Sequence, residues 1–188
     1  ILVTVNNFVP GSISADQTIC EGDVPAAFTS VTPAGDGTFT YQWKNSSDGI
    51  LFVDIALATA ETFAPPALTQ DTWYKRQVTS TLLGKDCIEE TNLVRVTVIN
   101  FLPGSIGSDQ TICEGSAPAA FTSGAPSGDG VKTYQWQSSP DNATWTNIGG
   151  ATSATCTSGV LVADTYFKRL VTATLNAIPC TEETNVIL

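Results

Sequence analysis

The sequence predicts an all-β fold in which one β-sandwich domain occurs twice in tandem. Three observations predict this fold. The 188-residue chain repeats itself, with Phe8 matching Phe101 at an offset of 93 residues. Its 15 Gly and 10 Pro, together with abundant Thr, Ser and Val, favour short strands joined by turns over helices. Turn residues also recur about every 8–12 positions, which is typical of a sandwich.

The repeat extends over most of the chain. The segment 8–13 recurs with one change as 101–106, and the segment 16–22 recurs unchanged as 109–115. The alignment continues without a gap, and 46 of the 88 superimposed positions are identical. Two copies this similar should share one fold.

The same offset sets the expected domain boundaries. Residues 1–7 align with residues 94–100, so we expect them to be the last strand of a preceding repeat. Repeat 1 is then 8–100, and repeat 2 is 101–188 with its last strand truncated. A truncated strand predicts an open sheet edge in repeat 2, unless a following segment or another chain fills it.

The strands of each repeat alternate apolar and polar residues. Alternation places Tyr41 and Trp43 on one face of one strand, and Tyr74 and Val78 on one face of another. Turns are expected at 35–37 and 47–49 and at their counterparts in repeat 2. The predicted core therefore includes the aromatic residues Trp43, Tyr74, Trp136 and Phe167.

Two features specify the kind of sandwich. A Trp lies in the third strand of each repeat, and an aromatic residue follows a Leu-x-x-Asp-Thr corner at 68–72 and again at 161–165. Both features are typical of immunoglobulin-like domains. The predicted fold is all-β, with two tandem immunoglobulin-like β-sandwich domains.

The repeat sorts the five cysteines into two matched pairs and one remainder. Cys20 matches Cys113, and Cys87 matches Cys180. Four cysteines allow three connectivities, but only Cys20–Cys87 with Cys113–Cys180 keeps the repeats equivalent, so one intradomain disulfide per repeat is predicted. Each would contribute about 4 kcal/mol in the chain-entropy model and would imply export. A zinc site is the alternative, but the chain has no His and no close Cys pair. Cys156 is expected to be a buried, unreactive free thiol.

Two arginines occupy inward-facing positions. Arg76 and Arg169 lie in register with Tyr74 and Phe167 on their strands. Each is expected to reach the end of the sandwich or to pair with a carboxylate, because a buried, unpaired guanidinium is very costly.

Composition argues against several functional classes. The formal net charge of −10 makes nucleic acid an improbable partner, and no apolar run is long enough to insert into a membrane. Without His the chain has no Ser-His-Asp triad or Cys–His pair, and the adjacent Glu89 and Glu90 point to opposite faces of a strand. We therefore expect no enzyme activity and no cofactor. Calcium binding at the Asp-containing turns stays open.

The order of motifs resembles a known type of repeat. The pattern Gly-x-Ile-x-x-Asp-Gln-Thr-Ile-Cys-x-Gly-x-x-Pro, then Tyr-Gln-Trp, then Ala-Thr-x-x-Thr, then Tyr/Phe-x-Arg, covers nearly the whole chain. It resembles the tandem Ig-like repeats of very large Bacteroidetes surface proteins, among them gliding-motility adhesins and substrates of type IX secretion. The resemblance implies a cell-surface or secreted location and no catalytic residues.

The leading functional hypothesis is a structural spacer in an adhesin or filament, whose partners are neighbouring repeats of the same chain. A second hypothesis is a module whose loops bind surface glycans or proteins, with Phe52, Trp145, Trp73 and Tyr166 as the exposed aromatic candidates. A third is assembly with other subunits by strand exchange, in which a strand such as 1–5 completes the sheet of a neighbour.

Overall fold

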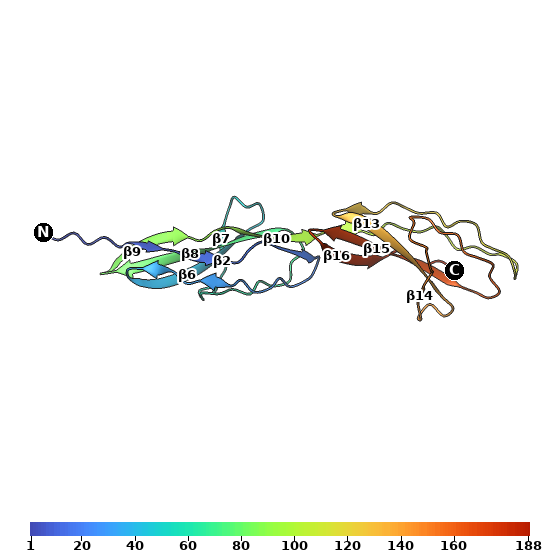
Figure 1. Ribbon diagram of the computed structural model, residues 1–188, viewed down its shortest axis with the longest axis horizontal. Helices are drawn as coiled ribbons and strands as arrows, with labels where there is room; N and C mark the ends of the chain where they lie inside the picture. Colours follow the sequence, from blue (N-terminus) through green and yellow to red (C-terminus); the bar gives the residue numbers. More distant parts are fainter. The chain divides into compact units, whose positions relative to one another are not determined.

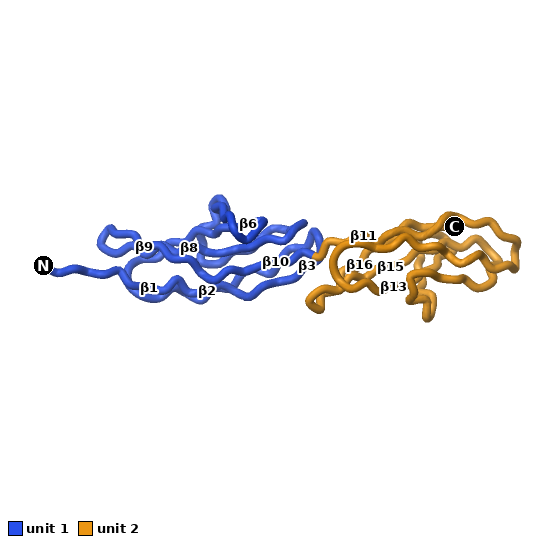
Figure 2. Tube along the Cα trace, turned by 90° about the horizontal axis from the view of Figure 1, so that it is seen from above, with its two compact units in different colours: residues 1–98 blue, residues 99–188 orange.

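The chain folds entirely as strands and loops. The computed structural model describes residues 1–188 and contains sixteen strands and no helix (Figure 1). It divides into two compact units, Ile1–Val98 and Ile99–Leu188, which are coloured separately in Figure 2. Because there is no helix at all, no helix can cross a membrane.

Unit 1 contains ten strands, most of them short. Only two exceed six residues, and these form the centre of its main sheet. In chain order the strands are β1 (Phe8–Val9), β2 (Ser12–Ile13), β3 (Gln17–Cys20), β4 (Ser30–Val31), β5 (Ala34–Gly35), β6 (Thr38–Ser46), β7 (Val53–Asp54), β8 (Thr72–Leu82), β9 (Lys85–Glu90) and β10 (Val94–Ile99).

The main sheet of unit 1 is built around β8. Strand β6 pairs along one edge of β8, while the other edge is shared by β10 at its beginning and β9 at its end. The sheet order is β3-β10-β8-β6-β7, with β9 also on β8. Two smaller pairs, β1–β5 and β2–β4, lie outside this sheet. As a result β9 and β3 lie at opposite ends of unit 1 (Figure 2).

Aromatic residues fill the core of unit 1. Trp43 and Tyr74 are 0% and 1% exposed, and Phe28 stacks on the Trp43 ring with the centroids 5.7 Å apart. Phe63 stacks on the same indole at 5.5 Å. Val94, Val96 and Val98 of β10 are also buried, so β10 contributes a full apolar face. The indole nitrogen of Trp43 donates to the carbonyl of Ala60, which satisfies its one polar group.

Arg76 lies inside this core without an ion pair. Its guanidinium donates to Ser30 Oγ and to the carbonyls of Pro10 and Glu61, and it lies 4.8 Å from the centroid of the Tyr41 ring. Desolvation lowers the pKa of the Arg76 guanidinium, and the neighbouring Tyr41 and Glu61 act in the opposite direction. Of the two expected arrangements, pairing with a carboxylate is not found: backbone carbonyls and a hydroxyl, with an aromatic face, surround the guanidinium.

Unit 2 repeats this plan with fewer regular strands. Its longest strands form a four-stranded sheet of order β14-β13-β15-β16, with β11–β12 as a separate pair. The strands are β11 (Phe101–Leu102), β12 (Ser127–Gly128), β13 (Val131–Ser139), β14 (Thr146–Asn147), β15 (Tyr166–Leu175) and β16 (Ile178–Glu183).

The core of unit 2 matches that of unit 1 residue by residue. Trp136 and Phe167 are 0% and 3% exposed, and Phe121 packs against both rings. Cys156 takes the position that Phe63 has in unit 1 and is buried as a free thiol. Burial raises the pKa of the Cys156 thiol, which keeps it protonated at neutral pH. Arg169 hydrogen-bonds to the carbonyls of unit 2 as Arg76 does in unit 1.

The predicted intradomain disulfides are wrong. Cys20 and Cys180 are disulfide-bonded, whereas Cys87 and Cys113 are free thiols. Neither Cys20–Cys87 nor Cys113–Cys180 forms, because one cysteine of each predicted pair is a free thiol. The prediction rested on keeping the repeats equivalent and assumed that both cysteines of a repeat lie close together. The sheet order shows that they do not, because β3 and β9 sit on different parts of the sheet.

Candidate functional site

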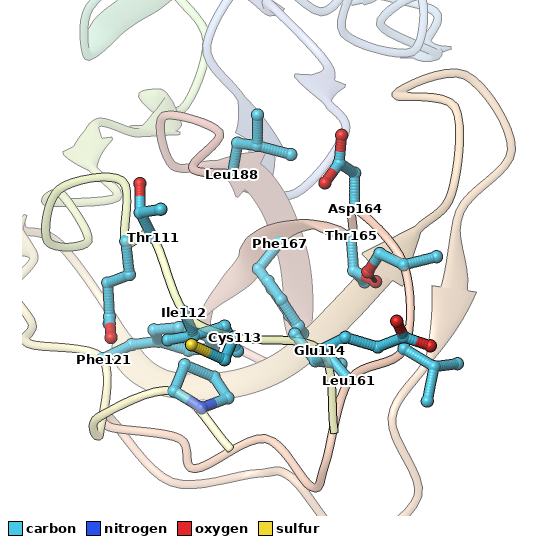
Figure 3. A pocket seen from close by; sticks show the side chains of 14 residues that line it. Thr111, Ile112, Cys113, Glu114, Phe121, Leu161, Asp164, Thr165, Phe167 and Leu188 are labelled. Atoms are coloured by element: carbon cyan, nitrogen blue, oxygen red, sulfur yellow. Dashed lines mark hydrogen bonds between the residues drawn. The ribbon is translucent and has the colours of Figure 1, made fainter. Parts of the chain in front are cut away.

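Unit 2 has a groove along one edge of its sheet. It has a volume of about 290 Å³ and lies between the segment 110–114 and the segment 161–165. Phe121 and Phe167 of the core line its interior (Figure 3). In Figure 3, Leu188 lies on one side of the groove, and Cys113 and Leu161 lie on the other.

Unit 1 shows what such a groove is shaped to hold. There β10 lies between β3 and β8, and Val96 of β10 is opposite Thr72 of β8. Val96 and Val98 are buried in this position. In unit 2 the last residues, Ile187 and Leu188, align with Val94 and Arg95. Leu188 lines the groove, so the groove borders the position that β10 has in unit 1.

The polar groups of the groove also match a strand-binding role. In unit 1 the Asp71 carboxylate accepts a hydrogen bond from the backbone nitrogen of Val98 at 2.8 Å, and it also forms an ion pair with Arg95. Its counterpart Asp164 lines the groove, and its carboxylate has no partner within the chain. The groove therefore presents an apolar floor with a free acceptor at the rim, which suits an extended segment with an available N–H.

The ends of the two bounding segments are held as in unit 1. Ile187 pairs with Phe167 through two backbone hydrogen bonds, and Gln110 donates to the carbonyl of Leu188 at 2.9 Å. Leu188 donates in turn to the Asp109 carboxylate. The residues 187–188 are thus hydrogen-bonded to Phe167 on one side and to Gln110 on the other. The groove continues this ladder of backbone hydrogen bonds.

The exposed aromatic candidates do not form a common surface for sugars. Lys75 lies over the ring of Phe52 at 4.2 Å, and its counterpart Lys168 lies over Trp145 at 4.3 Å. Lys75 also pairs with Glu90 at 2.7 Å. A cation thus covers one face of each ring. The same holds for Trp73, where Arg95 lies 5.0 Å from the ring centroid.

The acidic turns do not gather into a metal site. No group of three or more His, Cys, Asp or Glu side chains in the structure is arranged to hold a metal ion. Asp48 and Asp141 instead cap their own turns, accepting backbone hydrogen bonds from the residues that follow. This is the ordinary Asx-turn role of aspartate.

The sequence predicts an open sheet edge in repeat 2 but does not predict this groove. The position of Cys113 on the groove wall was not predicted. Cys113 lies beside the corner at 161–165 because Gly115, two residues after it, donates to the carbonyl of Leu161.

Comparison with protein families gives one match, which occurs twice. A family described as "Domain of unknown function (DUF8696)" matches residues 9–100 and again residues 102–187. A comparison with curated protein sequences gives no match.

Comparison with solved structures gives β-rich multidomain proteins. Domains A168–A170 of titin align with a TM-score of 0.51 and 15% identity over 96% of this chain, which spans 65% of that titin chain. Immunoglobulin domains 1–5 of Sidekick-1 align with a TM-score of 0.42 and 13% identity, over 94% of this chain and 36% of that one. The chicken CNTN1 FN1–FN3 domains align with a TM-score of 0.30 and 12% identity, over 92% of this chain and 68% of that one. The titin alignment supports an immunoglobulin-like fold and says nothing about function.

Proposed function

Because the chain belongs to the family described as "Domain of unknown function (DUF8696)" and contains two matches to it, we propose that it is a structural repeat segment of a large extracellular bacterial surface adhesin or filament. In this role it spaces or presents a more distal adhesive region. The two units are then two tandem immunoglobulin-like repeats, and their partners are neighbouring repeats.

The observation that carries this proposal is that each unit has a core of its own, built around a buried tryptophan. Trp43 in unit 1 and Trp136 in unit 2 are both fully buried, each donates its indole N–H to a backbone carbonyl, and each stacks on a Phe. Units that each have a core of their own and share 46 of 88 aligned residues are suited to serial repetition, because each adds length without needing a different partner.

The disulfide supports an extracellular location. Disulfides persist in oxidising compartments and are rare in the cytosol. The net charge of −10 also suits a surface exposed to solvent, because like charges limit self-association. The resemblance of the motifs to Bacteroidetes surface repeats supports the bacterial setting, including export by type IX secretion in a gliding-motility adhesin.

Pulling on the two ends of a single molecule tests the spacer role. After reduction, the chain should unfold in two steps of similar length, each releasing about 90 residues at about 3.4 Å per residue. Extension of the reduced chain without resistance would contradict a load-bearing spacer.

A glycan screen separates this proposal from a binding module. The spacer role predicts that the isolated chain binds no glycan above background. Specific binding that is lost on replacing Trp145 with Ala would favour the loop-binding alternative. Phe52→Ala serves as the matched substitution in unit 1, since both rings lie under a lysine.

The edge groove favours a second candidate function, assembly by strand exchange. Residues 1–7 form no strand, and Val3 and Val5 are 79% and 71% exposed. Their segment aligns with β10, so Val3 and Val5 correspond to the buried Val96 and Val98. A strand with this pattern, donated by another chain, fits the groove between 110–114 and 161–165.

A peptide experiment tests strand exchange. A peptide of residues 1–7 should bind the chain and protect the backbone amides of 161–165 from hydrogen exchange. The same peptide with Val3 and Val5 replaced by Asp should not bind, because the groove floor is apolar. Equal protection by both peptides, or protection by neither, would contradict this candidate.

A further inference from the structure

Unit 1 has a groove of its own beside β7, the edge strand of its main sheet. Two cavities of about 380 Å³ and 280 Å³ form it, and Asn45, Gln70 and Thr72 line both. Because the cavities share these three residues, they adjoin. Leu51 and Val53 line the first cavity, so one wall of the groove is apolar.

The β7 side of the groove is an uncovered part of the core face. Val53 is opposite Asn45, and Asn45 is opposite Tyr74 of β8, so the three side chains lie on one face of the sheet. Tyr74 is 1% exposed, whereas Val53 is 64% exposed. The buried core therefore ends between β8 and β7, and its apolar face continues into solvent.

Unit 2 has polar residues where unit 1 exposes these apolar ones. Leu51 and Val53 are 74% and 64% exposed, and their counterparts are Thr144 and Thr146. The backbone pairing is the same in both units, since Thr146 is opposite Ser138 as Val53 is opposite Asn45. The fold therefore does not require apolar side chains here, and their exposure in unit 1 is typical of a contact surface.

Two carboxamides in the groove are free to bind a ligand. The side chains of Asn45 and Gln70 line both cavities and make no hydrogen bond within the chain. The corresponding residues of unit 2 are Ser138 and Ala163. The fold therefore requires neither carboxamide.

Elsewhere in unit 1 a carboxamide holds a neighbouring segment by both backbone groups of one residue. Gln17 accepts a hydrogen bond from the Ala26 nitrogen at 2.8 Å and donates to the Ala26 carbonyl at 2.9 Å. Asn92 holds Ile13 in the same way, at 2.8 Å and 3.1 Å. A free carboxamide can hold the backbone of another chain by the same two bonds, because it carries both a donor and an acceptor.

The charge of the groove excludes acidic ligands. Asp48 lines the first cavity, and no Lys or Arg lines either cavity. Hydrogen bonds from the backbone nitrogens of Ile50 and Leu51 and from the Ser46 hydroxyl lower the pKa of the Asp48 carboxyl, so it is ionised at neutral pH. A carboxylate or phosphate on the ligand would be repelled.

The groove offers little stacking surface to a sugar. Its lining contains two aromatic residues, Phe63 and Tyr74. Phe63 stacks on Trp43 with the ring centroids 5.5 Å apart, and Tyr74 is buried. The free carboxamides and the apolar wall thus favour a peptide over a glycan.

We propose that this groove binds an extended peptide segment of a partner protein, with apolar side chains at alternate positions and no acidic residue. Asn45 and Gln70 hydrogen-bond to the backbone of the peptide, and Leu51 and Val53 pack against its apolar side chains. Alternation suits the site because successive side chains of an extended segment point to opposite sides. This binding role goes beyond that of a spacer and belongs to unit 1 alone.

NMR titration of the intact chain with a peptide pool tests the proposal. The pool consists of capped heptapeptides with Thr at alternate positions and Val, Leu, Ile or Ala at the others. The pool should shift the side-chain amide signals of Asn45 and Gln70 and leave the backbone signals of Ser138 and Ala163 unchanged. A pool with Glu in place of the apolar residues should shift none of them.

Substitutions by the residues of unit 2 define the contacts. Asn45→Ser and Gln70→Ala should each raise the dissociation constant about tenfold, because each removes two hydrogen bonds to the peptide backbone. Val53→Thr should weaken binding through the loss of apolar contact. Ser138→Ala is the control in unit 2 and should leave binding unchanged. Thermal unfolding of each variant establishes that the chain is folded.

Three results would overturn the proposal. The first is that the apolar pool shifts neither Asn45 nor Gln70 at millimolar concentration. The second is that a pool methylated on its backbone nitrogens binds as well as the unmodified pool, which would exclude recognition of the backbone. The third is that neutral oligosaccharides shift these signals and the peptides do not. Each result leaves the spacer role intact, because two unfolding steps under load do not depend on this groove.

Discussion

Asn185 and Ile106 are joined by two hydrogen bonds that imitate a strand ladder. The backbone nitrogen of Ile106 donates to Asn185 Oδ1 at 2.8 Å, and Asn185 Nδ2 donates to the carbonyl of Ile106 at 3.1 Å. A side-chain amide thus joins the segment before Cys113 to the segment that leads to the groove. Asn92 and Ile13 form the same pair in unit 1.

Asn185→Asp should destabilise unit 2, because a carboxylate accepts but cannot donate. The Ile106 carbonyl then loses its partner, and leaving such a group unsatisfied costs about 1–3 kcal/mol. Chemical denaturation followed by hydrogen exchange, resolved by unit, measures the loss. Asn92→Asp is the matched control and should destabilise unit 1 alone; a loss in both units from either substitution would contradict the assignment.

Cys156→Phe should stabilise unit 2. Its counterpart Phe63 stacks on Trp43. The backbone around the two positions is the same, because the Phe28 N–H donates to the Phe63 carbonyl and the Phe121 N–H donates to the Cys156 carbonyl. The added ring should contribute about 1–2 kcal/mol through buried area and stacking. The midpoint of thermal unfolding checks this.

The reverse change, Phe63→Cys, should cost unit 1 about 2–3 kcal/mol by leaving a cavity beside Trp43. If Cys156→Phe lowers the stability of unit 2, then the two cores differ in shape, and their residue-by-residue correspondence does not extend to packing.

The sequence predicts the strands well where alternation and repetition agree. Tyr74, Arg76 and Val78 are buried at alternate positions along β8, as a period of two requires. The repeat then extends each assignment to the second unit. These features are local, so residue spacing is sufficient to predict them.

The disulfide could not be predicted in the same way, because it depends on where distant strands end. Symmetry between repeats favoured Cys20–Cys87, but symmetry does not say how far apart the two cysteines of one repeat lie. Only the sheet order, with Cys20 near Leu68 and Cys87 opposite Ser80, shows that they are separated. The hydrogen bonds of Arg76 to main-chain carbonyls are likewise invisible in a sequence.

Arg169→Met should destabilise unit 2 strongly. The buried guanidinium donates to the carbonyls of Ala154, Pro103 and Gly124, and these would lose their donor. We expect a loss of about 3 kcal/mol or more, since each unsatisfied group costs about 1–3 kcal/mol. Urea denaturation followed by tryptophan fluorescence measures it.

Glu61→Ala tests whether a carboxylate contributes to the buried arginine. In unit 1 Glu61 accepts from Ser30, which itself accepts from Arg76. Unit 2 has Ala154 in that position and buries Arg169 equally well. The substitution should therefore cost less than about 1 kcal/mol, the range of exposed ion pairs. A loss as large as that of Arg169→Met would show that Glu61 is required for Arg76.

Asp141 should make the loop 140–144 sensitive to strong acid. Backbone hydrogen bonds from Thr144 and Ala143, and one from the Ser139 hydroxyl, lower the pKa of the Asp141 carboxyl from 3.8 to about 2. A folded-state pKa below the unfolded value means that the contribution to stability is fully present above about pH 4 and is lost as the pH falls through about 2. Carboxyl-carbon NMR should give a titration midpoint near 2 for Asp141, with the amide signals of Ala143 and Thr144 shifting over the same range. Asp141→Asn keeps an oxygen acceptor and should abolish the pH dependence of these amides while leaving the loop closed. A midpoint near 3.8 in the folded chain would show that the hydrogen bonds of this turn are not formed in solution.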